Sequence, residues 1–286
     1  MQTLDQLNTM TPDAFVAALD GVFEHATWVA ESAASRRPFL TVTALHDALM
    51  EITRAAPPDL CVRFLQGHPP LSPKALADPG LTASSRSEQT GLGMGALGKQ
   101  LTQFEMLSSA YEERFGFPFI VCVRRLTPHY VLRNLDRRLA KSPEQEREAA
   151  LAEIGYITRL RLADRLSGPG MPQIDGHLST HVLDTVRGKA AAAVPIELFR
   201  EGSLVGQSVT NHDGRTDTPL LPEGPLRIGR YELRFHVANY YADLPNPSDP
   251  PWYDVIPIRF GISEPEGRCH IPLLLGAWTY TTYRGS

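Results

Sequence analysis

The sequence predicts two domains, an all-α helical bundle followed by an all-β antiparallel sandwich. The length of 286 residues suits two domains of ~150 residues, each large enough to bury its own core. Apolar residues recur at helical spacing up to about residue 166, whereas later segments alternate with period two. Of the 24 prolines, 13 lie in the last 120 residues, as expected where turns join short strands. We therefore divide the chain into a first domain at 1–167, a linker at 168–176 and a second domain at 177–286.

The composition excludes several classes of protein. With 42% apolar residues, 21% charged residues and a net charge of −4, the chain is neither disordered nor fibrous, and it has no basic surplus for nucleic acid. No stretch approaches the ~18 apolar residues of a membrane span, and the first residues lack the pattern of a signal peptide. The three cysteines lack CxxC spacing, which argues against a disulfide framework or a thiolate metal site. We expect a cytoplasmic protein with neither a nucleic-acid nor a membrane partner.

Two helix starts in the first domain carry capping signals. Thr11 stands directly before a proline, and Ser142 stands before another proline and three residues before Gln145, which opens a helix expected to run to about Leu166. The stretch 67–93 is rich in Pro, Gly and Ser, so we expect it to be irregular, and a long irregular segment in a compact domain usually has a function. Helical spacing of apolar residues predicts further helices at 43–56, 94–115 and about 119–140.

Strands are predicted throughout the second domain. Apolar and polar residues alternate without a fault over 231–237, which is typical of a half-buried strand. Turn-forming residues at 211–214 and 244–247 separate the candidates and favour an antiparallel sandwich. The other candidate strands are 178–184, 195–201, 252–262 and 270–282.

Three segments of the second domain contain residues able to do acid–base chemistry. They are Leu-Ser-Thr-His-Val-Leu-Asp-Thr at 178–185, Asp-Gly-Arg at 213–215, and the stretch from His-Ile-Pro-Leu-Leu-Leu at 270–275 to Tyr-Arg-Gly-Ser at 283–286. Over nearly all of 177–286 this pattern resembles the transthyretin-related 5-hydroxyisourate hydrolases. The resemblance implies a transthyretin-like sandwich that opens a ring amide with water and needs no cofactor.

The same resemblance implies which side chains form the hydrolase site. It gives catalytic roles to His181, Arg215 and His270, and substrate contacts to Tyr283 and Ser286. A neutral imidazole titrates near working pH and can take a proton from water, while a guanidinium stabilises the oxyanion that develops on the amide. The two histidines lack the close spacing and carboxylate companion of a catalytic zinc site, so we predict no metal.

Three segments of the first domain also form a specific combination. Gly-His-Pro-Pro-Leu at 67–71 is followed by Ser-Ser-Arg-Ser-Glu-Gln at 84–89 and by Phe-Gly-Phe-Pro-Phe-Ile-Val-Cys at 115–122. Across about residues 8–166 the chain resembles the helical 2-oxo-4-hydroxy-4-carboxy-5-ureidoimidazoline (OHCU) decarboxylases. The resemblance implies an all-α domain in which His68 is the catalytic acid and Glu88 works beside it. It also implies substrate contacts from Pro69, Ser85, Gln89, Ile120 and Arg161.

For the decarboxylation the protein needs only to bind the substrate and to deliver a proton to it. The ring of the ureidoimidazoline has a carbonyl and an imine-like bond conjugated to the reacting carbon, so it can absorb the electrons left by carbon dioxide. An imidazole near neutrality can then donate a proton to one face, while Glu88 orients it or holds the substrate hydroxyl and Arg161 balances the substrate charge. We therefore predict no cofactor for this domain either.

The two resemblances support one another because the product of the hydrolase is the substrate of the decarboxylase. The chain is thus predicted to be a bifunctional enzyme of urate degradation that makes (S)-allantoin, and family analogy implies a homo-oligomer with tetrameric hydrolase and dimeric decarboxylase contacts. The alternative is a transthyretin-like carrier of small molecules fused to a helical scaffold. Transport transthyretins lack the histidines and the Tyr-Arg-Gly-Ser end, and this chain has both.

Overall fold

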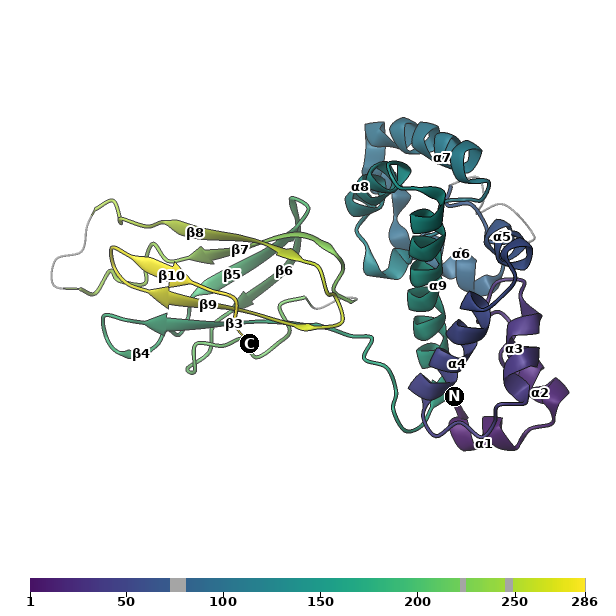
Figure 1. Cartoon of the computed structure of the whole chain (residues 1–286). Coiled ribbons are helices and arrows are strands. Elements are labelled where there is room, and N and C mark those ends of the chain that lie inside the picture. Colours follow the sequence, from purple (N-terminus) through teal and green to yellow (C-terminus); the bar gives the residue numbers. More distant parts are fainter. Residues whose placement is uncertain (73–80, 222–224, 245–248, 286) are drawn as a thin grey trace. The chain divides into compact units, whose positions relative to one another are not determined.

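The computed structural model describes residues 1–72, 81–221, 225–244 and 249–285 (Figure 1). The chain divides into two compact units, Met1–Ile174 and Asp175–Ser286. The first unit is helical and the second is built from strands, as the sequence predicts. The division falls inside the predicted linker, but the start of that segment packs on the helices. The carbonyl groups of Pro169 and Gly170 accept hydrogen bonds from the amides of Val42 and Thr43, at 2.9 and 3.2 Å.

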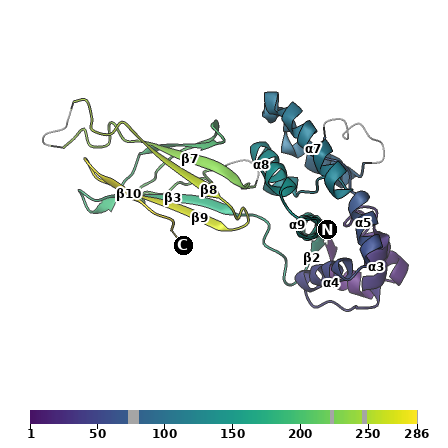
Figure 2. The same cartoon turned by 45° about the horizontal axis from the view of Figure 1, so that its top comes forward.

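The helical unit is arranged around its longest helix, α9, which lies among the other helices in Figures 1 and 2. A short parallel pair, β1 (Gln2–Thr3) with β2 (Leu166–Ser167), joins the two ends of the unit. The α-helices are α1 (Leu4–Thr9), α2 (Pro12–Ala18), α3 (Thr27–Ala34), α4 (Val42–Arg54), α5 (Pro58–Gln66), α6 (Ala83–Leu92), α7 (Leu101–Phe115), α8 (Pro128–Leu139) and α9 (Pro143–Arg165). The described residues of the unit also form the 3₁₀ helices η2 (Met94–Gln100) and η3 (Val123–Arg125).

The capping signals in the sequence are used as predicted. The Thr11 hydroxyl accepts a hydrogen bond from the Ala14 amide at the start of α2. At the start of α9, Ser142 and Gln145 form a reciprocal capping box with two hydrogen bonds of 3.2 Å. Each such cap satisfies amides that the helix itself leaves unpaired, and it stabilises the fold by about 1 kcal/mol.

The predicted helix at 119–140 is wrong in its first part, because α8 begins only at Pro128. Residues 117–123 are all buried, so this run has no exposed face of the kind a surface helix presents. Side chains satisfy its backbone in place of helical hydrogen bonds. Glu153 accepts from the Cys122 amide at 2.8 Å, and Arg138 donates to the Ile120 carbonyl at 2.7 Å.

The stretch 67–93, predicted to be irregular, contains helix α6. The Thr82 hydroxyl caps this helix by accepting from the Ser85 amide at 3.2 Å, and the helix ends at Gly93, which has a φ of +69°. The sequence of α6 is mostly polar, so apolar periodicity did not reveal it. Residues 73–80 of the stretch lie outside the described residues.

The second unit is a sandwich of two four-stranded sheets. Their strand orders are β10-β9-β3-β4 and β6-β5-β7-β8. The strands are β3 (His177–Asp184), β4 (Lys189–Ala190), β5 (Pro195–Arg200), β6 (Ser203–Val209), β7 (Gly229–His236), β8 (Val255–Ile262), β9 (Arg268–Leu275) and β10 (Tyr280–Thr282). Strand β6 was not predicted, and the single strand expected at 270–282 is a hairpin. The Gly276 amide donates to the Thr279 carbonyl at 2.8 Å and turns the chain there.

The prediction of an antiparallel sandwich needs one correction. Strand β3 pairs with β9 in parallel over eight residues, with Ser179 opposite His270 and His181 opposite Pro272. These strands are far apart in sequence and the chain passes through the other sheet between them, so no short hairpin requires them to be antiparallel. The other strand pairs described in the two sheets are antiparallel.

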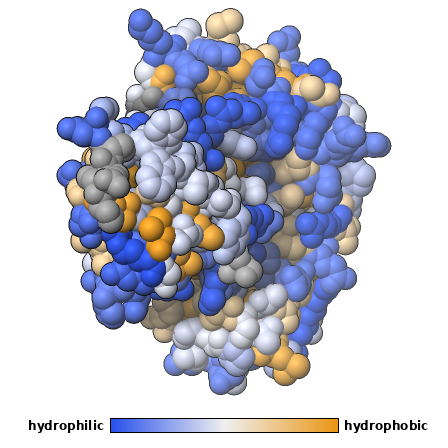
Figure 3. All heavy atoms as spheres, turned by 90° about the vertical axis from the view of Figure 1, so that its left-hand side faces the viewer, coloured by the Kyte–Doolittle hydropathy of each residue, from blue (hydrophilic) through white to orange (hydrophobic). Residues whose placement is uncertain are grey.

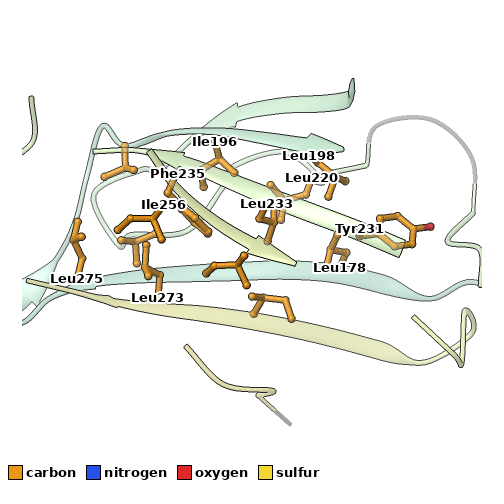
Figure 4. Packing of buried hydrophobic residues seen from close by; sticks show 14 of the residues in the cluster. Leu178, Ile196, Leu198, Leu220, Tyr231, Leu233, Phe235, Ile256, Leu273 and Leu275 are labelled. Atoms are coloured by element: carbon orange, nitrogen blue, oxygen red, sulfur yellow. The ribbon is translucent and has the colours of Figure 1, made fainter. Parts of the chain in front are cut away.

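The space between the sheets is filled by one apolar core (Figure 4). Val182, Leu198, Leu233, Phe235 and Leu273 are all fully buried within it. Alternate residues of β3 face this core, so Ser179 and His181 lie on the opposite, outer face of their sheet. The outer face of β3 and β9 is therefore where the predicted hydrolase side chains are found.

Candidate active sites

One cavity of the helical unit is lined by every predicted residue of that unit. The segments that meet there are the end of α5, helix α6, the extended run 117–123 and helix α9. The predicted lining residues are His68, Pro69, Ser85, Glu88, Gln89, Ile120 and Arg161, and the wall also includes Leu71, Phe119, Val121, Val123 and Ile157. A small apolar wall with convergent polar groups is the usual character of a small-molecule site.

His68 lies buried in this cavity as a neutral imidazole. Burial lowers its pKa to about 4, against smaller opposing effects from the Phe64 carbonyl and the Glu24 carboxylate. Its Nδ1 lies 3.1 Å from the Phe64 carbonyl oxygen, and since a carbonyl can only accept, Nδ1 has the proton. Nε2 is then the unprotonated nitrogen. In the free site His68 is therefore neutral, with its proton on Nδ1.

Glu88 is held by a two-point ion pair. The Arg161 Nε and Nη2 atoms donate to its two carboxylate oxygens at 3.0 and 2.8 Å. The Glu88 side chain is 13% exposed, so this carboxylate is anchored from behind and still reaches the cavity. Fork-to-carboxylate contacts of this kind fix geometry as well as charge.

Arg161 itself is more occupied than expected. Its remaining N–H groups donate to the Gly21 carbonyl, the Glu24 carboxylate and the Ser85 hydroxyl, at 3.1, 2.8 and 3.0 Å. A guanidinium has five N–H groups, and protein acceptors take all five. The predicted contact between Arg161 and the substrate charge is not what this arrangement favours, because the residue is directed toward Glu88 and Glu24.

Glu24 is a buried carboxylate beside this cavity that sequence reasoning did not single out. It lies between α2 and α3, is 1% exposed, and accepts hydrogen bonds from Thr82 and Ser85 as well as Arg161. Burial alone would raise its pKa, but the Arg161 charge and these hydrogen bonds hold the pKa below its ordinary value. No local pattern marks this residue, because each of its partners is far away in the sequence.

Two more polar groups of the cavity are placed where they can form hydrogen bonds with the edge of a ring-shaped ligand. Gln89 is buried, its Nε2 donates to the Pro70 carbonyl, and its Oε1 has no partner within the described residues. The backbone at Ile120 is fixed from outside the cavity by the buried Arg138, whose Nε donates to Glu146 at 2.7 Å. A free buried acceptor such as Gln89 Oε1 favours a ligand that brings N–H groups.

The hydrolase candidates meet on the outer face of the β10-β9-β3-β4 sheet. The register places Ser179 beside His270, and the Ser179 hydroxyl lies 2.9 Å from His270 Nδ1. His181 is two residues further along β3 on the same face. The parallel pairing of β3 and β9, which the sequence did not reveal, is thus what brings the two histidines together.

A tight turn brings Arg215 to the same face. The Val182 amide donates to the Gly214 carbonyl at 2.8 Å, and a Cβ on Gly214 would lie 2.3 Å from the Val182 carbonyl, so only glycine fits there. Burial and the Arg215 charge lower the pKa of both His181 and His270, and each imidazole is therefore neutral at pH 7. Neutral imidazoles beside a cation are suited to accepting a proton from water.

The chain end runs back along β9. The Gly285 amide donates to the His270 carbonyl at 2.9 Å, and Tyr283, two residues earlier, is 57% exposed. The imidazole of His270 packs directly on Gly285, where a Cβ would lie 2.5 Å from the ring atom Cδ2. Ser286 lies outside the described residues.

We expect Gly285→Ala to lower the hydrolytic rate about 10- to 100-fold, because the methyl group forces the His270 ring out of place and small displacements of a reacting group are costly. The matched control is Gly261→Ala on β8, where the nearest atom to an added Cβ is 4.0 Å away. Steady-state rates of ring opening should separate the two variants. Equal rates for Gly285→Ala and the unaltered protein would contradict the packing argument.

A second cavity, of about 250 Å³, contains none of the predicted site residues. Its wall includes Tyr241, Trp252 and Trp278, of which the two tryptophans are 67% and 61% exposed. Figure 3 shows the side of the molecule that lies on the left in Figure 1, where several apolar side chains are exposed among hydrophilic ones. In the part of the chain that the structure describes, no group of three His, Cys, Asp or Glu side chains could hold a metal ion. No helix described is long and apolar enough to cross a membrane.

The fold and the two sites define a two-domain protein in which a helical decarboxylase-type domain precedes a transthyretin-type sandwich. The family model for OHCU decarboxylase matches residues 8–163, and that for the HIUase/transthyretin family matches residues 178–285. The chain belongs to these two families, the OHCU decarboxylases through its first domain and the HIUase/transthyretin family through its second.

Individual relatives cover each domain and the whole chain. A 5-hydroxyisourate hydrolase of Deinococcus radiodurans is 48% identical over 119 residues, which are 40% of this chain and all of that protein. An OHCU decarboxylase of Haloferax volcanii is 36% identical over 166 residues, 58% of this chain and 96% of that one. The crystal structure of an (S)-allantoin synthase is 32% identical, covers 99% of this chain and 100% of that chain, and aligns with a TM-score of 0.56.

Proposed function

We propose that this protein performs two consecutive reactions, hydrolysis of 5-hydroxyisourate to OHCU and decarboxylation of OHCU to (S)-allantoin. The observation that carries the proposal is the assembly of two separate polar sites in one chain, each built from segments distant in sequence. The similarity to an (S)-allantoin synthase along the whole chain supports the pairing of the two domains.

In the hydrolase site a water molecule attacks the ring amide. One of the neutral imidazoles of His181 and His270 takes the proton of this water, and the C–N bond breaks as the ring nitrogen receives a proton. Arg215 lies close enough to lower the pKa of both histidines, so its charge also lies near the oxyanion that forms on the amide oxygen when water attacks the amide carbon. Ser179 orients His270 through Nδ1.

In the decarboxylase site the substrate carboxylate leaves as carbon dioxide, and its electron pair passes to the imine-like ring nitrogen, which takes up one proton from water. The hydroxyl on the reacting carbon then loses its proton to become a carbonyl, and the neighbouring carbon gains a proton, so the product has one proton more than the substrate anion and one carbon dioxide less. His68 Nε2 is placed to accept the hydroxyl proton and to return one to a single face. Gln89 Oε1 accepts from the N–H groups of the substrate, and the anchored Glu88 orients the ring.

Fusion of the two activities has a physical advantage. OHCU decays spontaneously to racemic product, and a second site on the same chain meets it at a high effective concentration. The handedness of allantoin is therefore determined by the helical domain and not by the decay in water.

The test uses freshly made 5-hydroxyisourate and the intact protein. Ultraviolet absorbance follows ring opening, and circular dichroism follows the optical activity of allantoin, each measured against buffer alone. We expect faster loss of 5-hydroxyisourate and an excess of the S form. An unchanged absorbance decay would refute the hydrolase, and racemic product would refute the decarboxylase.

We also propose that the protein is a cytoplasmic homo-oligomer that binds only small molecules. Arg215 and Tyr283 are exposed in a single chain, which supports a hydrolase site that a second copy covers. Cys61, Cys122 and Cys269 are free thiols, which suits a reducing compartment. Light scattering of the purified protein should give a mass at least twice the 31.6 kDa of a single chain, and a mass of 31.6 kDa would contradict the oligomer.

A further inference from the structure

The ion pair between Glu88 and Arg161 includes a second carboxylate, that of Glu24. It therefore has more negative charge than an ordinary ion pair. Two carboxylates, Glu24 and Glu88, share the single guanidinium of Arg161, and all three side chains are buried or nearly so, at 1%, 13% and 5% exposed. Only Glu88 and Arg161 line the cavity, while Glu24 lies behind them. Burying an additional charge is expensive unless its partners compensate for it, so the position of Glu24 requires an explanation.

We propose that Glu24 is a positioning residue of the decarboxylase site, which locks the Arg161 guanidinium in the orientation that presents Glu88 to the substrate. This inference rests on the decarboxylation proposed above. Arg161 uses its Nε and Nη2 edge for Glu88 and its Nη1 atom for Glu24. Because the guanidinium is planar, it cannot turn toward the cavity without breaking contacts on both sides.

Glu24 also binds the start of helix α6, the helix that contains Glu88. The hydroxyls of Thr82 and Ser85, the N-cap and third residue of α6, donate to Glu24 at 2.7 and 3.0 Å. Glu88 and Gln89 lie one turn further along the same helix. One carboxylate therefore holds both the cation that anchors Glu88 and the start of the helix that bears it.

The charges around His68 determine what the loss of Glu24 does to the pKa of this imidazole. Burial lowers the pKa of His68 most, and the charges of Arg161 and His25 lower it further, whereas the Phe64 carbonyl and the Glu24 carboxylate raise it. His68 and Arg161 line the same cavity. Removing the negative charge of Glu24 while Arg161 stays in place should therefore lower the pKa of His68.

The decisive variant is Glu24→Gln, which keeps the shape and removes the charge. We expect kcat for decarboxylation to fall at least ~10-fold while KM changes less, because the reacting groups are misplaced. We also expect the acid limb of kcat/KM, which reports groups of the free enzyme, to move to lower pH by ~0.5 to 1 unit. The hydrolase of the same chain is the internal reference and should keep its rate.

Two further variants make the test decisive. Glu51→Gln removes a surface ion pair of the same length, 2.8 Å to Arg36, and should leave both reactions unchanged. Glu24→Asp keeps the charge but shortens the side chain, so kcat should fall while the acid limb stays in place. If Glu24→Gln does not fold, as judged by helical circular dichroism, Glu24→Asp alone decides the matter.

The inference is overturned by an unchanged kcat in Glu24→Gln, by an acid limb that moves to higher pH, or by an unchanged kcat in Glu24→Asp. Failure of the proposed function looks different, since the unaltered protein would then produce racemic allantoin. If the unaltered protein makes (S)-allantoin and the Glu24→Gln variant has the same kcat, the proposed decarboxylase activity stands. Only the positioning role of Glu24 is then refuted.

Discussion

Replacing His68 by alanine should lower the rate of decarboxylation by a factor of about 100 to 10,000 and leave ring opening of 5-hydroxyisourate unchanged. The size follows from the usual contribution of a positioned acid–base group. His68 is the one imidazole that lines the described cavity, and its Nε2 is unprotonated because Nδ1 donates to the Phe64 carbonyl. With alanine in this position no other imidazole can exchange a proton with the substrate there.

The measurement is the accumulation of OHCU after 5-hydroxyisourate has been consumed, together with the optical activity of the allantoin that eventually forms. OHCU should persist for as long as it does in buffer, and the allantoin should be racemic. His129→Ala is the matched control, since His129 belongs to the same domain and does not line the cavity. Optically pure allantoin from His68→Ala would show that the proton is delivered by another group.

Replacing His270 by alanine should have the opposite effect, a loss of ~100- to 10,000-fold in hydrolysis with decarboxylation of supplied OHCU unchanged. His270 is the imidazole that three separate segments position, through Ser179 on β3, its own strand β9 and the backbone of Gly285. Its pKa is lowered by burial and by the Arg215 charge, so it is neutral and able to accept a proton at pH 7.

Stopped-flow absorbance of 5-hydroxyisourate gives the hydrolytic rate directly. The matched control is His236→Ala, because His236 is also a strand histidine, but it lies on β7 of the other sheet and contacts Glu197 at 3.0 Å. That variant should hydrolyse normally. The pair of substitutions at positions 68 and 270 thus uses each domain as the reference for the other, and loss of both reactions in either variant would argue against two independent sites.

The architecture could be predicted from the sequence because it depends on local patterns. Apolar spacing, capping residues and strand alternation each act over a few residues, so the helical domain, the sandwich and the caps at Thr11 and Ser142 followed directly. Two of the expectations that proved wrong, a helix through 119–127 and no helix at 83–92, concern segments whose backbone or charge is satisfied by distant side chains. Local propensity was overridden there by tertiary contacts.

The candidate residues could also be identified from the sequence. Short motifs contain the residue types that the chemistry needs, although they do not show how these residues are arranged in space. His68, Glu88, His181 and His270 were all identified from such motifs. Their protonation states were not, since the low pKa of His68 comes from burial, which no motif shows. For the same reason the neutral state of this imidazole in the free site became visible only in the structure.

What the sequence alone determined is therefore the kind of protein, together with a set of candidate reactive groups. Only the tertiary structure decided how these groups act together. The parallel pairing of β3 with β9 brings Ser179 to His270, and the meeting of α6 with α9 surrounds Arg161 with Glu24 and Glu88. The physical reason is that burial and electrostatic coupling depend on distance in space, and residues 60 to 140 positions apart in the chain come within 3 Å only once it has folded.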